Sequence, residues 1–266
     1  MRTYSTLSVT RKDRLLTIAL DRPDACNAVN LQMHDELADA FNFAASDEQS
    51  DVVVLTGSGR TFCAGGDPED IALNAAEPER FDHEARIAKR LVFAMLDLDK
   101  PLICRMNGNA LGLGATLALL CDVIFASSGA KIGDPHVCVG LVAGDGGAAI
   151  WAQRIGLGRA KEYLLTGEPI TAEQAEQIGL INHCIPASHL DAYVNSFCER
   201  LLHGSAKAIR WTKVLLNLEL KRVAHAVMDA GIAYESMTVH SADHREAIKA
   251  MQEKRKPVFC RDSGKP

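Results

Sequence analysis

Short apolar segments alternate with longer amphipathic segments through the first half of the chain. Residues 52–55 are three valines and a leucine, a continuous apolar run that is typical of a strand buried on both faces. Leu31, Leu37 and Phe41 recur instead at helical spacing. Glycine-containing turns separate the segments, so the order predicts an α/β core. The predicted strands are residues 15–20, 51–56 and 101–106, and the predicted helices are 30–44, 86–98 and 113–121.

The second half of the chain changes character, because apolar positions recur mostly at helical spacing. One predicted strand, residues 180–185, interrupts the helices. We place a boundary near residues 195–204, which divides the chain into a core of residues 1–200 and a helical C-terminal region of residues 201–266. The predicted helices are residues 150–155, 159–165, 172–178, 190–202, 206–218 and 223–237.

Composition narrows the class of protein. The 266 residues are 47% hydrophobic, and 29 basic against 34 acidic residues give a formal charge of −5, so a nucleic-acid-binding surface is not expected. The eight cysteines form no CxxC pair, which favours reduced thiols in a cytoplasmic protein. An 18-residue apolar run and a signal-peptide pattern are both missing, so no membrane association is expected. His240 and His244 are four residues apart without a third ligand pattern, so we expect surface histidines and no metal site.

Two glycine-rich turns carry the clearest chemical signal. Residues 56–67 follow one predicted strand and residues 107–114 follow another, and each turn leads into a helix start with unpaired N–H groups. Two such turns side by side would present two N–H donors to one oxygen, which is an oxyanion hole in outline. The alternative is that the glycines serve only tight turns. The spacing matches neither a P-loop nor a complete GxGxxG, so a nucleotide site is not expected.

Taken together, the motifs of this chain resemble those of the crotonase (enoyl-CoA hydratase/isomerase) superfamily over about residues 5–260. The resemblance implies a spiral of ββα units with a helical C-terminal region that makes oligomer contacts, in trimers or dimers of trimers. It also implies an acyl-CoA substrate, with coenzyme A as part of the substrate and no other cofactor. The motifs are Asp21-Arg22-Pro23, Phe62-Cys63-Ala64-Gly65-Gly66-Asp67, Asn107-Gly108 to Gly114, Cys121-Asp122, Gly156-Leu157-Gly158-Arg159-Ala160 and Leu165-Thr166-Gly167.

The same resemblance assigns site residues. The backbone N–H groups of Gly66 and Leu113 are expected to form the oxyanion hole for the thioester carbonyl. Substrate-binding positions carry over to Ala25, Cys26, Ala64, Asp67 and Thr116. In this family the reaction type depends on the side chains that reach the α and β carbons, so the fold and the reaction are separate predictions.

Both carboxylates expected of a hydratase are replaced. Thr116 stands at the position of the first glutamate and His136 at that of the second, so hydration by paired glutamates is not expected. A histidine with an ordinary pKa of about 6.5 exchanges protons near neutral pH. Asp145, nine residues on in a glycine-flanked turn, could orient the imidazole, act as a separate base, or merely cap the next helix.

A His and an Asp at these positions also resemble those of β-diketone hydrolases related to 6-oxocamphor hydrolase. In that reaction His136 would activate water for attack on a ketone, and the departing enolate would occupy the oxyanion hole. A further active-site histidine of that enzyme has no counterpart here, where Leu113 stands. A noncatalytic member of the superfamily is a third alternative.

The residues that would bind coenzyme A are harder to identify from the sequence than the candidate acid and base. Glu69 stands where the family often has a basic residue, and with Asp24 it would repel a phosphate. Compensating charge could come from Arg22 or from the basic residues 254–256, which could equally be a solvated helix end. Residues 82–84, Asp-His-Glu, are expected to be solvated.

Overall fold

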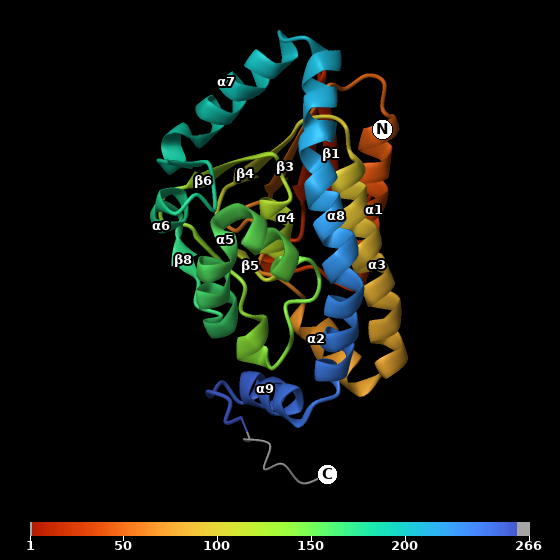
Figure 1. The fold of residues 1–266 in the computed structure, drawn as a ribbon, viewed down its shortest axis with the longest axis vertical. Coiled ribbons are helices and arrows are strands. Elements are labelled where there is room, and N and C mark those ends of the chain that lie inside the picture. Colours follow the sequence, from red (N-terminus) through yellow and green to blue (C-terminus); the bar gives the residue numbers. More distant parts are fainter. Residues whose placement is uncertain (1, 260–266) are drawn as a thin grey trace.

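The computed structural model describes residues 2–259, so Cys260 and the last residues of the predicted C-terminal region lie outside it. The chain forms a mixed α/β structure with a C-terminal helical region, as predicted (Figure 1). A six-stranded sheet has the order β1-β2-β3-β4-β6-β9 and is parallel except for the β1–β2 pair. Its strands are β1 (Leu7–Lys12), β2 (Leu15–Leu20), β3 (Val52–Gly57), β4 (Leu102–Met106), β6 (Val123–Ser127) and β9 (His183–Ile185).

A second, three-stranded sheet has the order β5-β7-β8. Strand β5 (Ala110–Leu111) runs parallel to β7 (Lys131–Gly133), and β8 (Ile170–Thr171) is antiparallel to β7. These strands are only two or three residues long, which is below the range in which periodicity identifies a strand, and the sequence did not predict them. Isolated bridges join Val29 to Gly66 and Cys63 to Ala110, and so connect the two glycine turns to the rest of the core.

Helices cover both faces of the large sheet. In β3, Val53 and Leu55 belong to the main apolar core with α1 and α3, whereas Val52 and Val54 pack against α7. The continuous apolar run therefore marks a strand buried on both faces, as predicted. Helices α1, α3 and α8 stand side by side along one side of the molecule, and α9 lies at the end that carries α2 (Figure 1). The helices are α1 (Leu31–Ser46), α2 (Pro68–Ala76), α3 (Pro78–Asp97), α4 (Leu113–Leu119), α5 (Gly147–Thr166), α6 (Ala172–Gln177), α7 (Leu190–Leu202), α8 (Ala206–Val239) and α9 (Ala242–Gln252), with 3-10 turns η1 (Pro23–Ala25), η2 (His136–Val139) and η3 (Ala187–His189).

The C-terminal region differs from the list of predicted helices in two ways: the structure adds α9, and two predicted helices merge. The two helices predicted at residues 206–218 and 223–237 are one helix, α8, of 34 residues. The four residues between them include no glycine or proline, and Arg222 pairs with Glu219 at helical spacing, so nothing ends the helix there. In α5 the two predicted pieces are indeed separated, because Gly156 has non-helical backbone angles.

The structure also bears on two further expectations, which concern the cysteines and membrane-spanning helices. All seven cysteines in residues 2–259 have free thiols, and four of them are buried. Among the same residues, no helix is both long and apolar enough to span a membrane.

Candidate active site

A cavity of about 270 Å³ lies where the two glycine turns meet α3, α8, η2 and α9. We call it the central cavity. Gly66 and Leu113, from the two turns, both line it. Ala64 also lines it, at the position where the sequence placed a substrate-binding residue.

The two glycine turns approach each other through their backbones. Gly65 has a φ of +98°, and a Cβ atom there would lie 2.9 Å from the carbonyl oxygen of Leu111. A Cβ atom on Gly112 would lie 3.8 Å from the Gly65 Cα. Hydrogen bonds between the turns, such as Leu111 N–H to Cys63 O at 3.0 Å, hold them together. Only glycine allows this approach, because any side chain at position 65 would meet backbone atoms.

The approach leaves two N–H donors unpaired beside the cavity. Leu113 is the first residue of α4, so its amide has no partner within the helix. Within residues 2–259, neither the Gly66 nor the Leu113 nitrogen donates a hydrogen bond. Two free amides from different turns, facing one cavity, can both donate to a single ligand oxygen.

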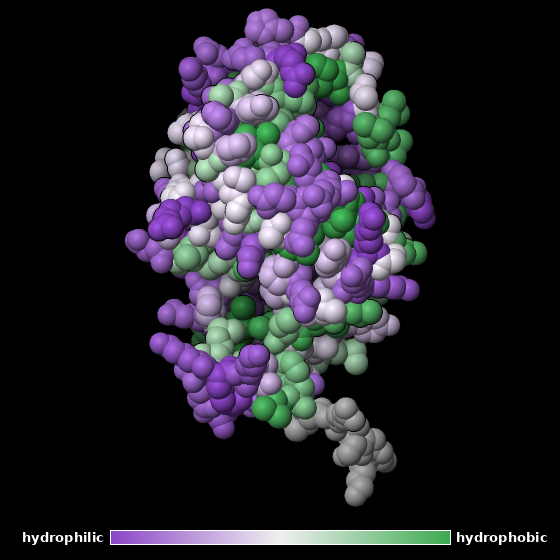
Figure 2. All heavy atoms as spheres, turned by 90° about the vertical axis from the view of Figure 1, so that its left-hand side faces the viewer, coloured by the Kyte–Doolittle hydropathy of each residue, from purple (hydrophilic) through white to green (hydrophobic). Residues whose placement is uncertain are grey.

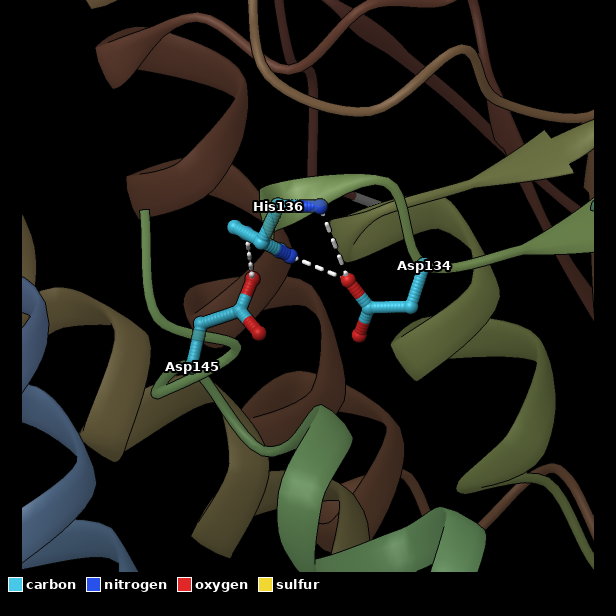
Figure 3. Close-up of side chains that lie close together, drawn as sticks. All are labelled: Asp134, His136 and Asp145. Atoms are coloured by element: carbon cyan, nitrogen blue, oxygen red, sulfur yellow. Dashed lines mark hydrogen bonds and ion pairs between the residues drawn. The ribbon is translucent and has the colours of Figure 1, made fainter. Parts of the chain in front are cut away.

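His136, on η2, is held between acidic side chains (Figure 3). Its Nδ1 is hydrogen-bonded to Oδ1 of Asp134, two residues earlier. Its Nε2 lies 3.6 Å from Oδ2 of Asp145, which sits in the turn before α5. The predicted approach of Asp145 to His136 is therefore present, and Asp145 precedes rather than occupies the N-cap of α5, which is Gly146. Asp134, which the sequence analysis overlooked, is fully buried and orients the ring.

A third carboxylate, from Glu235 on α8, also faces His136. Its Oε1 lies 4.0 Å from His136 Nε2, and the residue lines the central cavity. Sequence reasoning missed it because it lies 99 residues beyond His136. A signal was present, however. The buried positions Ala224, Met228, Gly231, Glu235 and Val239 of α8 recur at helical spacing, and a charged residue on such an apolar stripe marks a buried site.

Burial and charge together set the proton affinities of this cluster. Burial alone would lower the pKa of His136, but the carboxylates of Asp134, Asp145 and Glu235 outweigh it and raise that pKa well above its ordinary value. Burial raises the pKa of Asp145, although the charge of His136 opposes the shift. Burial, followed by the charge of Asp145, raises the pKa of Glu235 to about 8. The cluster therefore holds a cationic imidazole and exchanges protons near neutral pH.

These shifts predict how stability depends on pH. Between pH 4.5 and 8 Glu235 binds more protons in the folded than in the unfolded chain, so the free energy of unfolding falls as the pH rises. The raised pKa of His136 has the same sign, since its contribution is complete below the unfolded value and is lost as the pH rises through the folded value. Removing Glu235 should therefore flatten the pH profile.

In Glu235→Gln, the drop in Tm between about pH 6 and about pH 9 should be smaller than in the unchanged protein by about 3 °C or more. Thermal unfolding followed by circular dichroism measures both profiles. Glu199→Gln serves as the matched control, because the Glu199 side chain is 65% exposed on α7. Parallel profiles for all three proteins would contradict the assigned proton affinities.

The remaining predicted site residues lie around the central cavity rather than in it. Asp67 caps α2 and pairs with Arg22 at 2.8 Å, so Arg22 is committed to a protein carboxylate. Thr116 is fully buried on α4, and its Cγ2 would lie 3.0 Å from a Cβ atom on Gly146. Ala25 ends η1, and the exposed Cys26 follows it, its carbonyl accepting a hydrogen bond from the Ala64 amide.

Two expectations of solvated side chains are wrong. His244 is 1% exposed, lines the central cavity, and donates from Nδ1 to the carbonyl of Val139 at 2.7 Å. It is buried because α9 packs on η2, a contact that spacing along the chain does not show. Glu84 also lines the cavity and accepts a hydrogen bond from Asn74. At the C-terminal end, Arg255 pairs with Glu246 and Glu253, as expected of a helix end.

The acidic cluster also has the composition of a metal site. Ligand atoms of Asp134, His136 and Asp145 lie within 4.8 Å of one another. The same carboxylates favour a proton on the imidazole, and a proton and a metal ion compete for one nitrogen. The sequence-based expectation that the protein uses no metal therefore stays a prediction.

Comparison with known proteins places the chain in a family. The sequence profile of the enoyl-CoA hydratase/isomerase family matches residues 10–262. A 2,3-dehydroadipyl-CoA hydratase from Escherichia coli K12 is 33% identical over an alignment of 259 residues, and the match covers 96% of this chain and 98% of that protein. Among solved structures, an enoyl-CoA hydratase/isomerase from Mycobacterium paratuberculosis has a TM-score of 0.89 at 34% identity and covers 93% of this chain and 99% of its own.

A structural neighbour with a different reaction is also similar. It is a β-diketone hydrolase from the cyanobacterium Anabaena, with a TM-score of 0.83 at 29% identity over 89% of this chain and 95% of its own.

The fold and its homologues define an enzyme of the crotonase superfamily. The chain belongs to the enoyl-CoA hydratase/isomerase family, and its function is of the enoyl-CoA hydratase/isomerase type, as the resemblance in sequence implied.

Proposed function

We propose that this enzyme converts an acyl-CoA thioester through an enolate, as a lyase or isomerase that uses His136 and Asp145 in place of the usual paired glutamates. The observation that supports this most directly is the placement of two unpaired amides and the His136 cluster on one cavity. The amides of Gly66 and Leu113 form the oxyanion hole, and each is worth roughly 2.7–4 kcal/mol in the transition state. Binding the enolate better than the ground-state thioester supplies the catalysis.

Hydration of a 2-enoyl-CoA balances with the groups present. Asp145 accepts a proton from water while the water oxygen adds to the β carbon, and the negative charge moves to the thioester oxygen in the oxyanion hole. The imidazolium of His136 then donates a proton to the α carbon as the enolate collapses. Proton transfer from Asp145 back to His136, across 3.6 Å, restores the starting state. The net change is the addition of one water molecule.

Hydrolysis of a β-diketone is the second candidate, and the Anabaena neighbour favours it. Here Asp145 takes a proton from water, the resulting hydroxide attacks one ketone carbonyl, and the carbon–carbon bond breaks, after which the imidazolium of His136 is the acid. The enolate that leaves is held by the same two amides and is protonated by His136. Arg22 is already paired with Asp67, and the exposed Glu69 carries a negative charge. Neither residue would attract the phosphates of coenzyme A, which also favours a substrate without coenzyme A.

Turnover assays separate these reactions. Purified protein is incubated with a short and a medium 2-enoyl-CoA, and loss of the conjugated thioester absorbance is followed. In parallel, a cyclic 1,3-diketone without coenzyme A is followed by loss of its absorbance. Turnover of a thioester supports the first reaction, whereas turnover of the diketone alone replaces it by the second. Absence of both activities favours a noncatalytic member of the superfamily.

We further propose that the protein assembles as a homotrimer or a dimer of trimers. Large apolar side chains are exposed on α5 and α8. Figure 2 shows hydrophobic side chains lying among hydrophilic ones on one face of the molecule. Light scattering coupled to size-exclusion chromatography should give about three or six times 28.8 kDa. A mass of one chain would contradict this assembly. The most exposed of these side chains are Leu157, Leu165, Leu215, Leu216 and Met237.

A further inference from the structure

A second polar cluster lies on the wall of the central cavity, apart from His136. It consists of His34 on α1, Asn74 on α2 and Glu84 on α3, and all three residues line the cavity. His34 is 2% exposed and Asn74 is 5% exposed. The reaction proposed above uses none of them.

The orientation of the Asn74 amide follows from its neighbour. Burial alone would raise the pKa of Glu84, but the nearby His34 ring, 3.8 Å away, and a hydrogen bond from Asn74 lower it below its ordinary value. Glu84 is therefore a carboxylate, which only accepts hydrogen bonds. The NH₂ group of Asn74 must face it, and Nδ2 donates to Glu84 Oε2 at 2.5 Å. The amide oxygen consequently points away from Glu84.

This arrangement leaves buried polar atoms without partners. Within the described residues, Oδ1 of Asn74 has no hydrogen-bond partner, and neither ring nitrogen of His34 has one. The nearest group to His34 is Glu84, whose Oε1 lies 3.8 Å from Nδ1. Such atoms are costly to bury unless a ligand or water satisfies them. All three residues line the cavity and these atoms lie just behind its surface, so a ligand group that enters the wall here would give them a partner.

We propose that His34 and Asn74 form a subsite for a hydroxyl group on the acyl part of the substrate, beyond the reacting carbons. A hydroxyl donates one hydrogen bond, to Oδ1 of Asn74, and accepts another, from a ring N–H of His34. A carbonyl group on the ligand has no hydrogen to donate to the asparagine oxygen. A carboxylate on the ligand would be repelled by the negative charge of Glu84. The proposal rests on the acyl-CoA function proposed above, and it defines the class of acyl group that the site selects.

The subsite lies close to the reacting groups. His136, Asp145 and Glu235 line the same cavity as His34, Asn74 and Glu84, so the two clusters share one space. We therefore expect the hydroxyl on the acyl chain beyond the reacting carbons, and positions C4, C5 and C6 are the ones to test. Hydroxyl groups at C3 are products of hydration itself and are not the group in question.

Equilibrium binding tests the subsite without turnover. Isothermal titration calorimetry compares saturated hexanoyl-CoA with its 4-, 5- and 6-hydroxy derivatives. One hydroxylated compound should bind the unchanged protein at least about tenfold more tightly than hexanoyl-CoA. Asn74→Leu and His34→Leu should each remove most of this preference. Val239→Ala, on the apolar wall of the same cavity, is the matched control and should change the affinities of both compounds by a similar factor.

The outcomes distinguish the subsite from the proposed function. Equal affinity for hexanoyl-CoA and all three derivatives overturns the subsite, while turnover of an enoyl-CoA by the same preparation keeps the proposed function. A hydroxyl preference that persists in both leucine variants also overturns the assignment to His34 and Asn74. If no acyl-CoA binds and none is turned over, both proposals fail.

Discussion

Replacing His136 by alanine is expected to lower kcat by about 10²–10⁴-fold, the range typical of removing a general acid or base. His136 is the basic group in a cluster of three carboxylates and lines the central cavity, and in the proposed reaction its proton goes to the substrate. Without it, the α carbon of the enolate has no cationic donor beside the oxyanion hole. Steady-state kinetics on the substrate class that the turnover assays identify measure the loss.

Two further variants separate chemistry from stability. His136→Ala also leaves the fully buried Asp134 without its partner, and an unpaired buried charge destabilises a protein by roughly 3–5 kcal/mol. His136→Gln keeps a donor for Asp134 and should fold better, yet it should be equally inactive because an amide does not exchange protons near neutral pH. His203→Ala, at the exposed end of α7, is the control. Near-normal kcat in a folded His136→Gln protein would exclude His136 as the acid.

Gly65→Ala should reduce kcat by about 10²–10³-fold, the usual loss of one oxyanion-hole donor. The added Cβ would lie 2.9 Å from the carbonyl oxygen of Leu111, which is backbone and cannot rotate away. The turn must shift, and the amide of Gly66, the next residue, moves with it. The effect should appear in kcat more than in KM, because the hole binds the enolate more strongly than the thioester.

Gly129→Ala is the matched control for that variant. Both glycines have a positive φ, +98° at Gly65 and +79° at Gly129, so both substitutions strain the backbone, but a Cβ atom at Gly129 meets nothing within 4 Å. It should lose about 1 kcal/mol of stability and keep its kcat. If folded Gly65→Ala keeps a kcat close to that of Gly129→Ala, the glycines serve only tight turns and the proposed oxyanion hole is wrong.

The pattern of apolar and polar residues was enough to predict an element when that element is long and its secondary structure depends on residues close to it in sequence. The run at residues 52–55 identified β3, and helical spacing identified α1 and α7. Pattern also missed β1 and β6, and it missed β5, β7 and β8 because these strands are too short. It divided α8 in two, although good helix formers continue through the gap. For the short strands the deciding factor, strand pairing, acts between residues far apart in sequence. In α8 nothing local ends the helix, and the helix also packs on α3 and α5.

The candidate site likewise has features that the sequence showed and features that only the tertiary structure showed. The sequence by itself determined the two glycine turns and, through the family resemblance, the replacement of the usual glutamates, and it offered His136 and Asp145 as a candidate pair, because these features lie in short segments with recognisable order and spacing. Only the tertiary structure added Glu235 to that pair and brought His34, Asn74 and Glu84 to the same cavity. These side chains come from four helices spread over 202 residues, from His34 to Glu235. Their proton affinities and unpaired atoms arise from burial and from one another's charge, and neither exists until the helices pack.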